Sequence, residues 1–355
     1  METSLLSREE SNAVKGVLIL LVILGHDIPF VRLTDPWMVM VWIYLFHIHS
    51  FFLLPYLYPL KKLSRGRLRD SFIRFYVPFL VLSFVLMALR LFSVNGNGMG
   101  LTLPEVLLGL VGGSPEQMKS IFGVQFPWFL PAMFMAGVVR EAFMAASPVC
   151  KGLLFIMGCF SILLVFLPFI SIPATCANLA LSLRFLVMGL LVRKFCEKGW
   201  FGNAALVSIL LSGSICFFVH YRCCLRPFHY GYPMEDIYKA LRFIMTASFV
   251  MFLWGIRTLL AKSSFLVEFG KYSFSIYMLH AFIGYFVNWT LSWIGVSNWL
   301  SAFICLITVA GASFLGARII ERMGKLQALF MPKGWQDFAD AWHRICRCRS
   351  FSSQD

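Results

Sequence analysis

The chain has 355 residues, of which 59% are apolar and only 14% are charged, whereas soluble globular chains have roughly 45–50% apolar and 25% charged residues. This composition excludes an ordinary soluble enzyme. Apolar runs of about twenty residues recur along nearly the whole sequence, which is the length that a bilayer-crossing helix needs. We therefore expect an all-α, polytopic integral membrane helix bundle.

The net charge also fits a membrane protein. Lys and Arg number 31 and Asp and Glu number 17, which gives +14, a surplus that in a soluble protein would suggest nucleic acid as a partner. Here the basic residues gather in alternate connections between apolar runs, which is the positive-inside pattern. Membrane lipid is thus an expected partner and nucleic acid is not.

Ten transmembrane helices are predicted from the apolar runs. They lie near 14–33, 38–57, 71–92, 127–146, 152–171, 177–195, 201–219, 238–258, 271–293 and 298–319. The organisation that follows is a short N-terminal segment at 1–13, a bundle at 14–319 and a tail at 320–355.

The connection at 57–74 fixes the predicted orientation, because it contains six basic residues and only one acidic residue, Asp70. Such a connection belongs in the cytoplasm, and ten crossings then place both termini there. The long connection at 93–126 is predicted to lie outside and to contain a short helix around 106–111. The tail mixes aromatic and basic residues and is expected to form an amphipathic helix against anionic lipid.

Ionisable residues inside apolar runs are costly and are therefore candidates for function. The first run carries Lys15 near its cytoplasmic end and Gly25-His26-Asp27 farther along, with His26 expected near mid-membrane. Eleven helical residues separate Lys15 from His26 by about 16 Å. Lys15 is either an anion-binding group or a snorkelling anchor. His26, with Asp27 beside it, is either a general base or a neutral imidazole bonded to the backbone.

Two further runs carry histidines at similar depth. Phe46-His47-Ile48-His49 lies in the second run, and the ninth run contains Gly270-Lys271-Tyr272-Ser273 and ends in Tyr277-Met278-Leu279-His280. His26, His47 and His280 can therefore converge in one cavity. No two of them have the i, i+4 spacing of a helix-borne metal pair, so no metal is expected. Ser273 and Tyr277 could bind a polar acceptor or bond their own helix backbone.

Together these stretches resemble the membrane acyltransferase family 3 over nearly the whole bundle. Its members have a basic residue and a run ending in Gly-His, then a Phe-His-x-Pro-x-Phe-Phe stretch, and finally a Gly-x-x-Ser-x-x-Ile-Tyr-x-x-His stretch. In this chain Lys15 stands where the family usually has arginine, and His49 stands where it usually has proline. Trp128 and Arg74 look like marks of the branch related to fucose 4-O-acetylases.

The resemblance implies that an acyl group, usually acetyl from cytoplasmic acetyl-CoA, is transferred to a hydroxyl of a surface or lipid-linked glycan. The catalytic candidates are His26, Asp27, His47 and His280. Lys15 and Arg74 are the candidates for holding the phosphates of CoA, and Trp128, Ser273 and Tyr277 are those for the acceptor. The expected location is the bacterial cytoplasmic membrane.

A different class of function is a transporter or flippase for a glycan or organic acid. Proton-coupled carriers normally need carboxylates within the membrane. Asp27 is the only clear carboxylate well inside an apolar run, and Glu141 lies near the end of another. This scarcity disfavours transport, and release of CoA from acetyl-CoA would distinguish the two functions.

Overall fold

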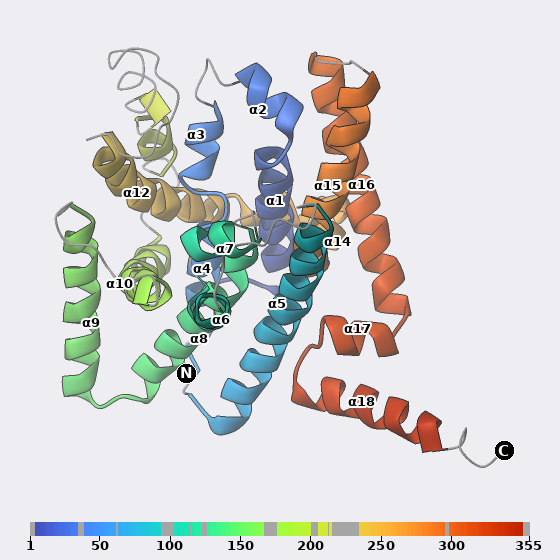
Figure 1. Cartoon of the computed structure of the whole chain (residues 1–355). Helices are drawn as coiled ribbons and strands as arrows, with labels where there is room; N and C mark the ends of the chain where they lie inside the picture. The colour runs from blue at the N-terminus through green and yellow to red at the C-terminus, as the bar shows by residue number, and fades with distance from the viewer. Residues whose placement is uncertain are drawn as a thin grey trace. The chain divides into compact units, whose positions relative to one another are not determined.

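The computed structural model describes residues 4–34, 39–61, 63–93, 103–113, 115–122, 126–166, 176–199, 205–211, 213–214, 234–294 and 298–350. Every regular element in these residues is a helix, which confirms the predicted all-α class (Figure 1). Contacts divide the chain into two compact units. The first consists of Met1–Pro59, Leu163–Pro168 and Val187–Arg318, and the second of Leu60–Ile162, Phe169–Leu186 and Ile319–Asp355.

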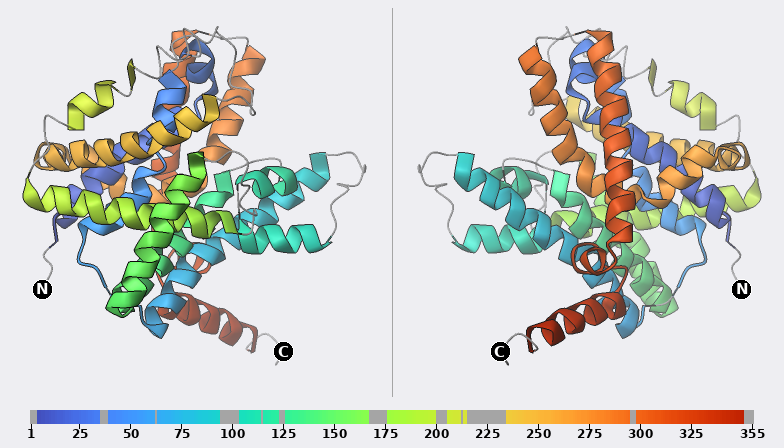
Figure 2. Two further views of the ribbon diagram at one scale, coloured as in Figure 1. Left: turned by 90° about the vertical axis from the view of Figure 1, so that its left-hand side faces the viewer. Right: turned by 90° about the vertical axis from the view of Figure 1, so that its right-hand side faces the viewer.

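The first unit contains the helices that carry the candidate histidines. They are α1 (Arg8–Gly25), α2 (Ile28–Thr34), α3 (Val39–Tyr44), α4 (Ser50–Leu53), η2 (Leu54–Leu57), η4 (Leu164–Phe166), α12 (Met234–Gly255), α13 (Arg257–Ala261), α14 (Ser264–Lys271), α15 (Ser273–Ile294) and most of α16 (Trp299–Arg322). Helix α1 lies beside α14 and α15 (Figure 1). Helix α15 runs beside α16, where Leu279 touches Gly316 (Figure 2).

The second unit contains the longest helix of the described chain. Its elements are α5 (Arg65–Ser93), α6 (Leu103–Gly112), α7 (Pro115–Phe122), η3 (Phe126–Trp128), α8 (Phe129–Ala145), α9 (Pro148–Leu163), α17 (Lys325–Phe330) and α18 (Trp335–Ser350). Helix α10 (Ala177–Lys198) contributes residues to both units. Helix α18 packs near the beginning of α5, where Trp335 N donates to Asp70 Oδ1 at 3.0 Å.

Two described helices are long and apolar enough to cross a bilayer alone, α5 over Arg65–Ala88 and α16 over Trp299–Arg322. Helices α1 and α2 pass the same test together, although a bend of 76° separates them. The protein is thus an integral membrane protein by its apolar helices. The total of ten spans and the side on which each terminus lies stay predictions.

The distribution of side chains within the units also suits a lipid solvent. Large apolar groups face outward, with 63% of Ile156, 83% of Trp293 and 60% of Phe303 exposed. Polar groups such as Ser301 and Ser313 are fully buried. Exposed apolar surface on this scale is costly in water and favourable in hydrocarbon, where polar residues are the ones that turn inward.

Two predicted spans are not continuous helices. A bend of 76° divides the span at 14–33 into α1 and α2, so the prediction of one straight helix there is wrong. The run at 38–57 folds as α3, α4 and η2, joined by tight turns, so the prediction of a single helix there is wrong. The reason lies in the backbone, since Leu45, Phe46 and Phe51 each donate to the residue three positions before them. Bonds of this i−3 type tighten and interrupt an α-helix.

The other predicted elements correspond to helices wherever the structure describes them. The 93–126 connection contains α6 and α7, so the short helix predicted there is confirmed. The tail forms α17 and α18. In the predicted span at 201–219, residues 205–211 and 213–214 are helical, and the other positions lie outside the described residues.

Candidate functional site

Two glycines set the position of α1 against α14. A Cβ atom at Gly16 would overlap the Leu266 carbonyl, and one at Gly270 would overlap the Asn12 carbonyl and lie 2.6 Å from Gly16 N. Small residues allow such close approach of helix backbones in membranes. Helix α14 ends at Lys271 and α15 begins at Ser273, so this crossing also positions the helix that carries His280.

His26 lies at the break between α1 and α2, which the sequence prediction had treated as one continuous span. Its backbone N–H donates to Ile23 O at 3.0 Å and closes the last turn of α1. The next residue, Asp27, is 2% exposed and begins α2, since its Oδ1 accepts from Phe30 N at 3.0 Å. This is the geometry of an N-cap. Asp27 thus has a structural role in addition to any role in catalysis.

The three candidate histidines come together around this break. The rings of His26 and His280 are 5.2 Å apart between centroids. Tyr44 connects the group, because its ring lies edge-on to His26 at 6.3 Å and to His47 at 4.8 Å. Its hydroxyl donates to Gly25 O at 2.9 Å. The sequence analysis predicted that the histidines converge but did not identify Tyr44.

Backbone carbonyls fix the orientation of two of these imidazoles. His47 Nδ1 lies 2.9 Å from Ile43 O, and His280 Nδ1 lies 2.6 Å from Tyr277 O. A carbonyl oxygen only accepts, so each Nδ1 carries a hydrogen, and each Nε2 is the acceptor nitrogen when the ring is neutral. His47 and His280 are 1% exposed, whereas His26 is partly exposed.

Helix α12 brings a cation toward the second histidine run. Thr246 Oγ1 bonds both Arg242 O on its own helix and Leu45 O, and the rings of Phe46 and Phe249 pack at 4.1 Å. The positive charge of Arg242 lies close enough to His47 and His49 to interact with both imidazoles. The sequence analysis did not select Arg242, although an arginine near the end of an apolar run was a signal for it.

The remaining candidates of the first unit lie along α1 and α15. Lys15 is half-buried on α1, between the predicted cytoplasmic end and His26. Ser273 is the first residue of α15, two turns or about 10 Å before His280. Tyr277 is buried, and its ring packs against that of His280 at 5.6 Å.

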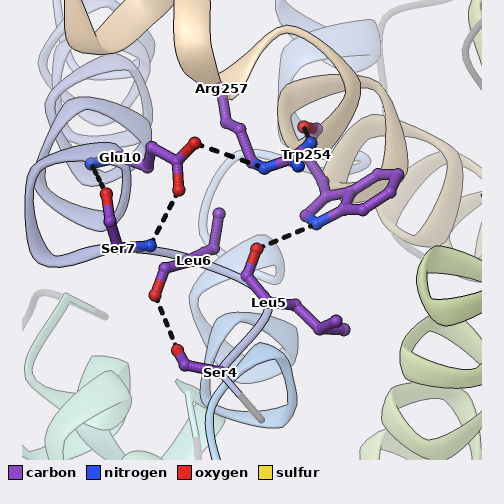
Figure 3. A network of polar contacts seen from close by, with 7 residues as sticks. All are labelled: Ser4, Leu5, Leu6, Ser7, Glu10, Trp254 and Arg257. Carbon is purple, nitrogen blue, oxygen red and sulfur yellow. Dashed lines mark hydrogen bonds and ion pairs between the residues drawn. The ribbon is translucent and has the colours of Figure 1, made fainter.

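A network of polar contacts anchors the beginning of α1 (Figure 3). Ser7 and Glu10 form a capping box, and Glu10 Oε1 pairs with Arg257 Nε at 3.4 Å. The Arg257 guanidinium lies 4.2 Å from the centre of the Trp254 ring, and Trp254 Nε1 donates to Leu5 O at 3.2 Å. These contacts tie the chain before α1 to the junction of α12 and α13.

A second arginine in the first unit is bonded in a similar way. Arg193 Nη1 donates to Tyr56 O at 3.0 Å and to Tyr58 O at 2.7 Å, and its Nε pairs with Glu197 Oε1 at 2.8 Å. The Tyr58 hydroxyl bonds Ser11 Oγ, and burial raises the pKa of Tyr58 to about 12. Arg193 and Arg257 are thus engaged in structural contacts and are poor candidates for binding a substrate anion.

Two predicted site residues lie in the second unit. Arg74 is on α5, with its guanidinium 5.6 Å from the centre of the neighbouring Phe75 ring. Trp128 ends η3 and packs edge-on against Phe129 at 6.3 Å. Both are described only within their own unit, so their roles stay predictions. In the described residues, no group of three or more His, Cys, Asp or Glu side chains has the arrangement of a metal site.

Comparison with known proteins gives one family. A family model described as an acyltransferase domain matches residues 8–318, which include all the candidate site residues. Comparisons with curated proteins and with solved structures give no significant match.

Proposed function

This chain belongs to the acyltransferase family whose model matches residues 8–318, and on that premise we propose that it is a membrane O-acyltransferase that moves an acetyl group from acetyl-CoA to a sugar hydroxyl. The acceptor is a surface or lipid-linked glycan, as in the branch related to fucose 4-O-acetylases. The bacterial cytoplasmic membrane is the proposed location. The observation that carries the proposal is the contact of His26 with His280 at the break after α1.

In the proposed reaction, His26 takes the proton of the acceptor hydroxyl, and the oxygen attacks the carbonyl carbon of the thioester. The C–S bond breaks, CoA leaves as a thiolate, and the thiolate takes the proton from the imidazolium. His280 and His47 are the alternative bases, since both have an oriented imidazole. Ser273, Tyr277 and Trp128 are the proposed acceptor-binding residues.

The proposed donor site uses cations for the phosphates of CoA. Lys15 is one turn beyond Ser11, whose hydroxyl bonds the Tyr58 hydroxyl. Its charge supports an anion-binding role, although lysine lacks the bidentate fork of the family's usual arginine. Arg74 is the second proposed phosphate ligand. The alternative function, a transporter or flippase, gains no support from Asp27, whose carboxylate caps α2.

The test is release of CoA by the purified protein from labelled acetyl-CoA, with and without sugar acceptors. Wild-type protein should release CoA in an acceptor-dependent manner, and His26→Ala should lower turnover by ~10²–10⁴, the usual contribution of a general base. Tyr285→Phe is a suitable control, because Tyr285 is 76% exposed on α15.

A failure of wild-type protein to release CoA with any acceptor would contradict the proposal. Wild-type turnover by His26→Ala would instead move the base to His280 or His47. Mass spectrometry of surface glycans from cells with and without the gene identifies the acceptor.

A further inference from the structure

The end of α1 needs a hydrogen-bond donor from outside the helix. The last carbonyls of a helix have no partner within it, and the bend of 76° after Gly25 prevents α2 from supplying one in line. Gly25 is buried, and an unpaired buried carbonyl is costly. The Tyr44 hydroxyl provides this donor at 2.9 Å from Gly25 O.

The same side chain also touches the two neighbouring histidines. Tyr44 and His47 are three residues apart and lie on one face of the same turn structure, which explains their edge-on contact at 4.8 Å. The other contact of the Tyr44 ring is with His26 at 6.3 Å and an interplanar angle of 83°. One tyrosine thus holds the carbonyl just before His26 and bounds the His26 ring on one side.

His280 is a second ring neighbour of His26, with the two centroids 5.2 Å apart. In the residues that the structure describes, no hydrogen bond of the His26 imidazole is found, in contrast to His47 and His280, whose Nδ1 atoms bond carbonyls. The orientation of His26 therefore depends on the backbone at Gly25 and Asp27 and on the flanking rings. Asp27 is fixed by capping α2, which leaves Gly25 to be fixed by Tyr44.

We propose that Tyr44 is a positioning residue that holds His26 in its reactive orientation through the Gly25 carbonyl. The hydrogen of the hydroxyl is engaged with the carbonyl, so Tyr44 does not serve as a proton donor to the substrate. A displacement of about 1 Å at a reacting group can lower a rate by about 10²-fold, so loss of this single bond should lower kcat. The kinetic part of this inference rests on the proposed function.

The substitution Tyr44→Phe removes the hydroxyl and keeps the ring. We expect kcat to fall at least tenfold while KM for acetyl-CoA changes less than twofold. Tyr285→Phe removes a hydroxyl from the exposed face of α15 and should leave both values unchanged. In a His26→Gln background, Tyr44→Phe should have no further effect, because it acts through His26. An equal loss of kcat in both backgrounds would overturn the proposal.

A chemical readout makes the test independent of activity. Diethyl pyrocarbonate modifies accessible imidazoles, and the modified peptides containing His26 and His343 can be quantified by mass spectrometry. His343 is exposed on α18 and serves as the internal reference. Tyr44→Phe should raise the ratio of His26 to His343 modification at least twofold in the monodisperse protein fraction.

The two readouts separate failure of this proposal from failure of the proposed function. Wild-type protein that releases no CoA contradicts the acyltransferase proposal, and the modification ratio then decides the role of Tyr44 alone. An unchanged ratio would overturn the positioning role, whatever the activity.

Discussion

Asp27 illustrates how a carboxylate in an apolar run can be required by helix geometry. It is 2% exposed, and its Oδ1 begins α2 by accepting from Phe30 N. Its Oδ2 has no hydrogen-bond partner among the described residues, and the Cys305 thiol is a neighbouring polar group. The capping contact gives a sufficient reason for a capping side chain at this position.

If Asp27 acts as a cap, its charge is dispensable. Asparagine is as good an N-cap as aspartate, so Asp27→Asn should keep turnover within about threefold of wild type. Asp27→Ala should lower stability by about 0.5–2 kcal/mol, measured as the thermal midpoint in detergent. Loss of turnover in a fully stable Asp27→Asn protein would assign the carboxylate to the chemistry.

Replacement of Lys15 should weaken the binding of acetyl-CoA and leave the chemical step nearly unchanged. A hydrogen bond to a charged group contributes about 1.5–3 kcal/mol, so Lys15→Ala should raise KM for acetyl-CoA roughly 10- to 100-fold with little change in kcat. Lys15→Arg should keep KM near that of wild type, because the family usually has arginine there. Unchanged kinetics in Lys15→Ala would establish the snorkelling-anchor interpretation.

At the scale of the helices, the crossing of α1 and α14 is the contact on which the site depends. The backbones approach at Gly16 and Gly270 so closely that neither position has room for a methyl group. Because both clashes are with backbone atoms, repacking of side chains cannot relieve them. The crossing therefore requires glycine at both positions, and it sets how closely α1 lies to α14, which leads into the helix that carries His280.

Gly270→Ala should consequently destabilise the protein by about 1–3 kcal/mol or more, the usual cost of overpacking, and should reduce turnover. Gly311→Ala is the matched control, since Gly311 lies within α16 and a Cβ there meets no atom within 4 Å. Thermal midpoints of the two variants in the same detergent provide the comparison. Equal midpoints would contradict the close crossing.

Helices with long apolar runs were predictable from sequence, whereas their interruptions were not. The prediction of 298–319 corresponds to α16 at Trp299–Arg322, and 177–195 corresponds to α10 at Ala177–Lys198. Averaged hydropathy lets α1 and α2 pass together as one span, so it did not mark the break at His26. The Asp27 cap and the Tyr44 hydroxyl on Gly25 O stabilise that break, and i−3 backbone bonds interrupt the second run.

In the candidate site, too, some features were predictable from sequence and others were not. Histidine depth along the predicted spans was enough to expect the convergence of His26, His47 and His280. The bond of the Tyr44 hydroxyl to Gly25 O was not predicted, because it depends on how α3 packs against the end of α1. Arg242 had a signal in the sequence, but its closeness to His47 depends on packing in the same way. Spacing along one chain segment gives no information about such pairs.

At the scale of the whole molecule, the contacts of the first unit can be compared with the predicted orientation in the membrane. The contacts of the first unit join the chain before α1, the end of η2, the end of α10 and the start of α13. The charge pattern predicts that these segments lie on the cytoplasmic side. Trp293 and Trp299 flank the 294–297 connection, as expected at a membrane interface.

Cysteine labelling in intact cells tests this orientation. With the native cysteines removed, a cysteine introduced at 65 should be protected from an impermeant thiol reagent, and one introduced at 97 should be labelled. Permeabilised cells should label both positions and serve as the control. Labelling at 65 but not at 97 would overturn the predicted topology.

The crossing at Gly16 and Gly270 also has a consequence for biosynthesis. About 250 residues separate the two glycines, so at about 5–20 residues per second the ribosome needs roughly 10–50 seconds to produce α14 after α1 has emerged. Throughout that interval α1 lacks α14, the helix whose backbone packs against Gly16. Nascent chains that stall before α14 therefore leave the Gly16 face of α1 without the backbone that covers it in the folded protein.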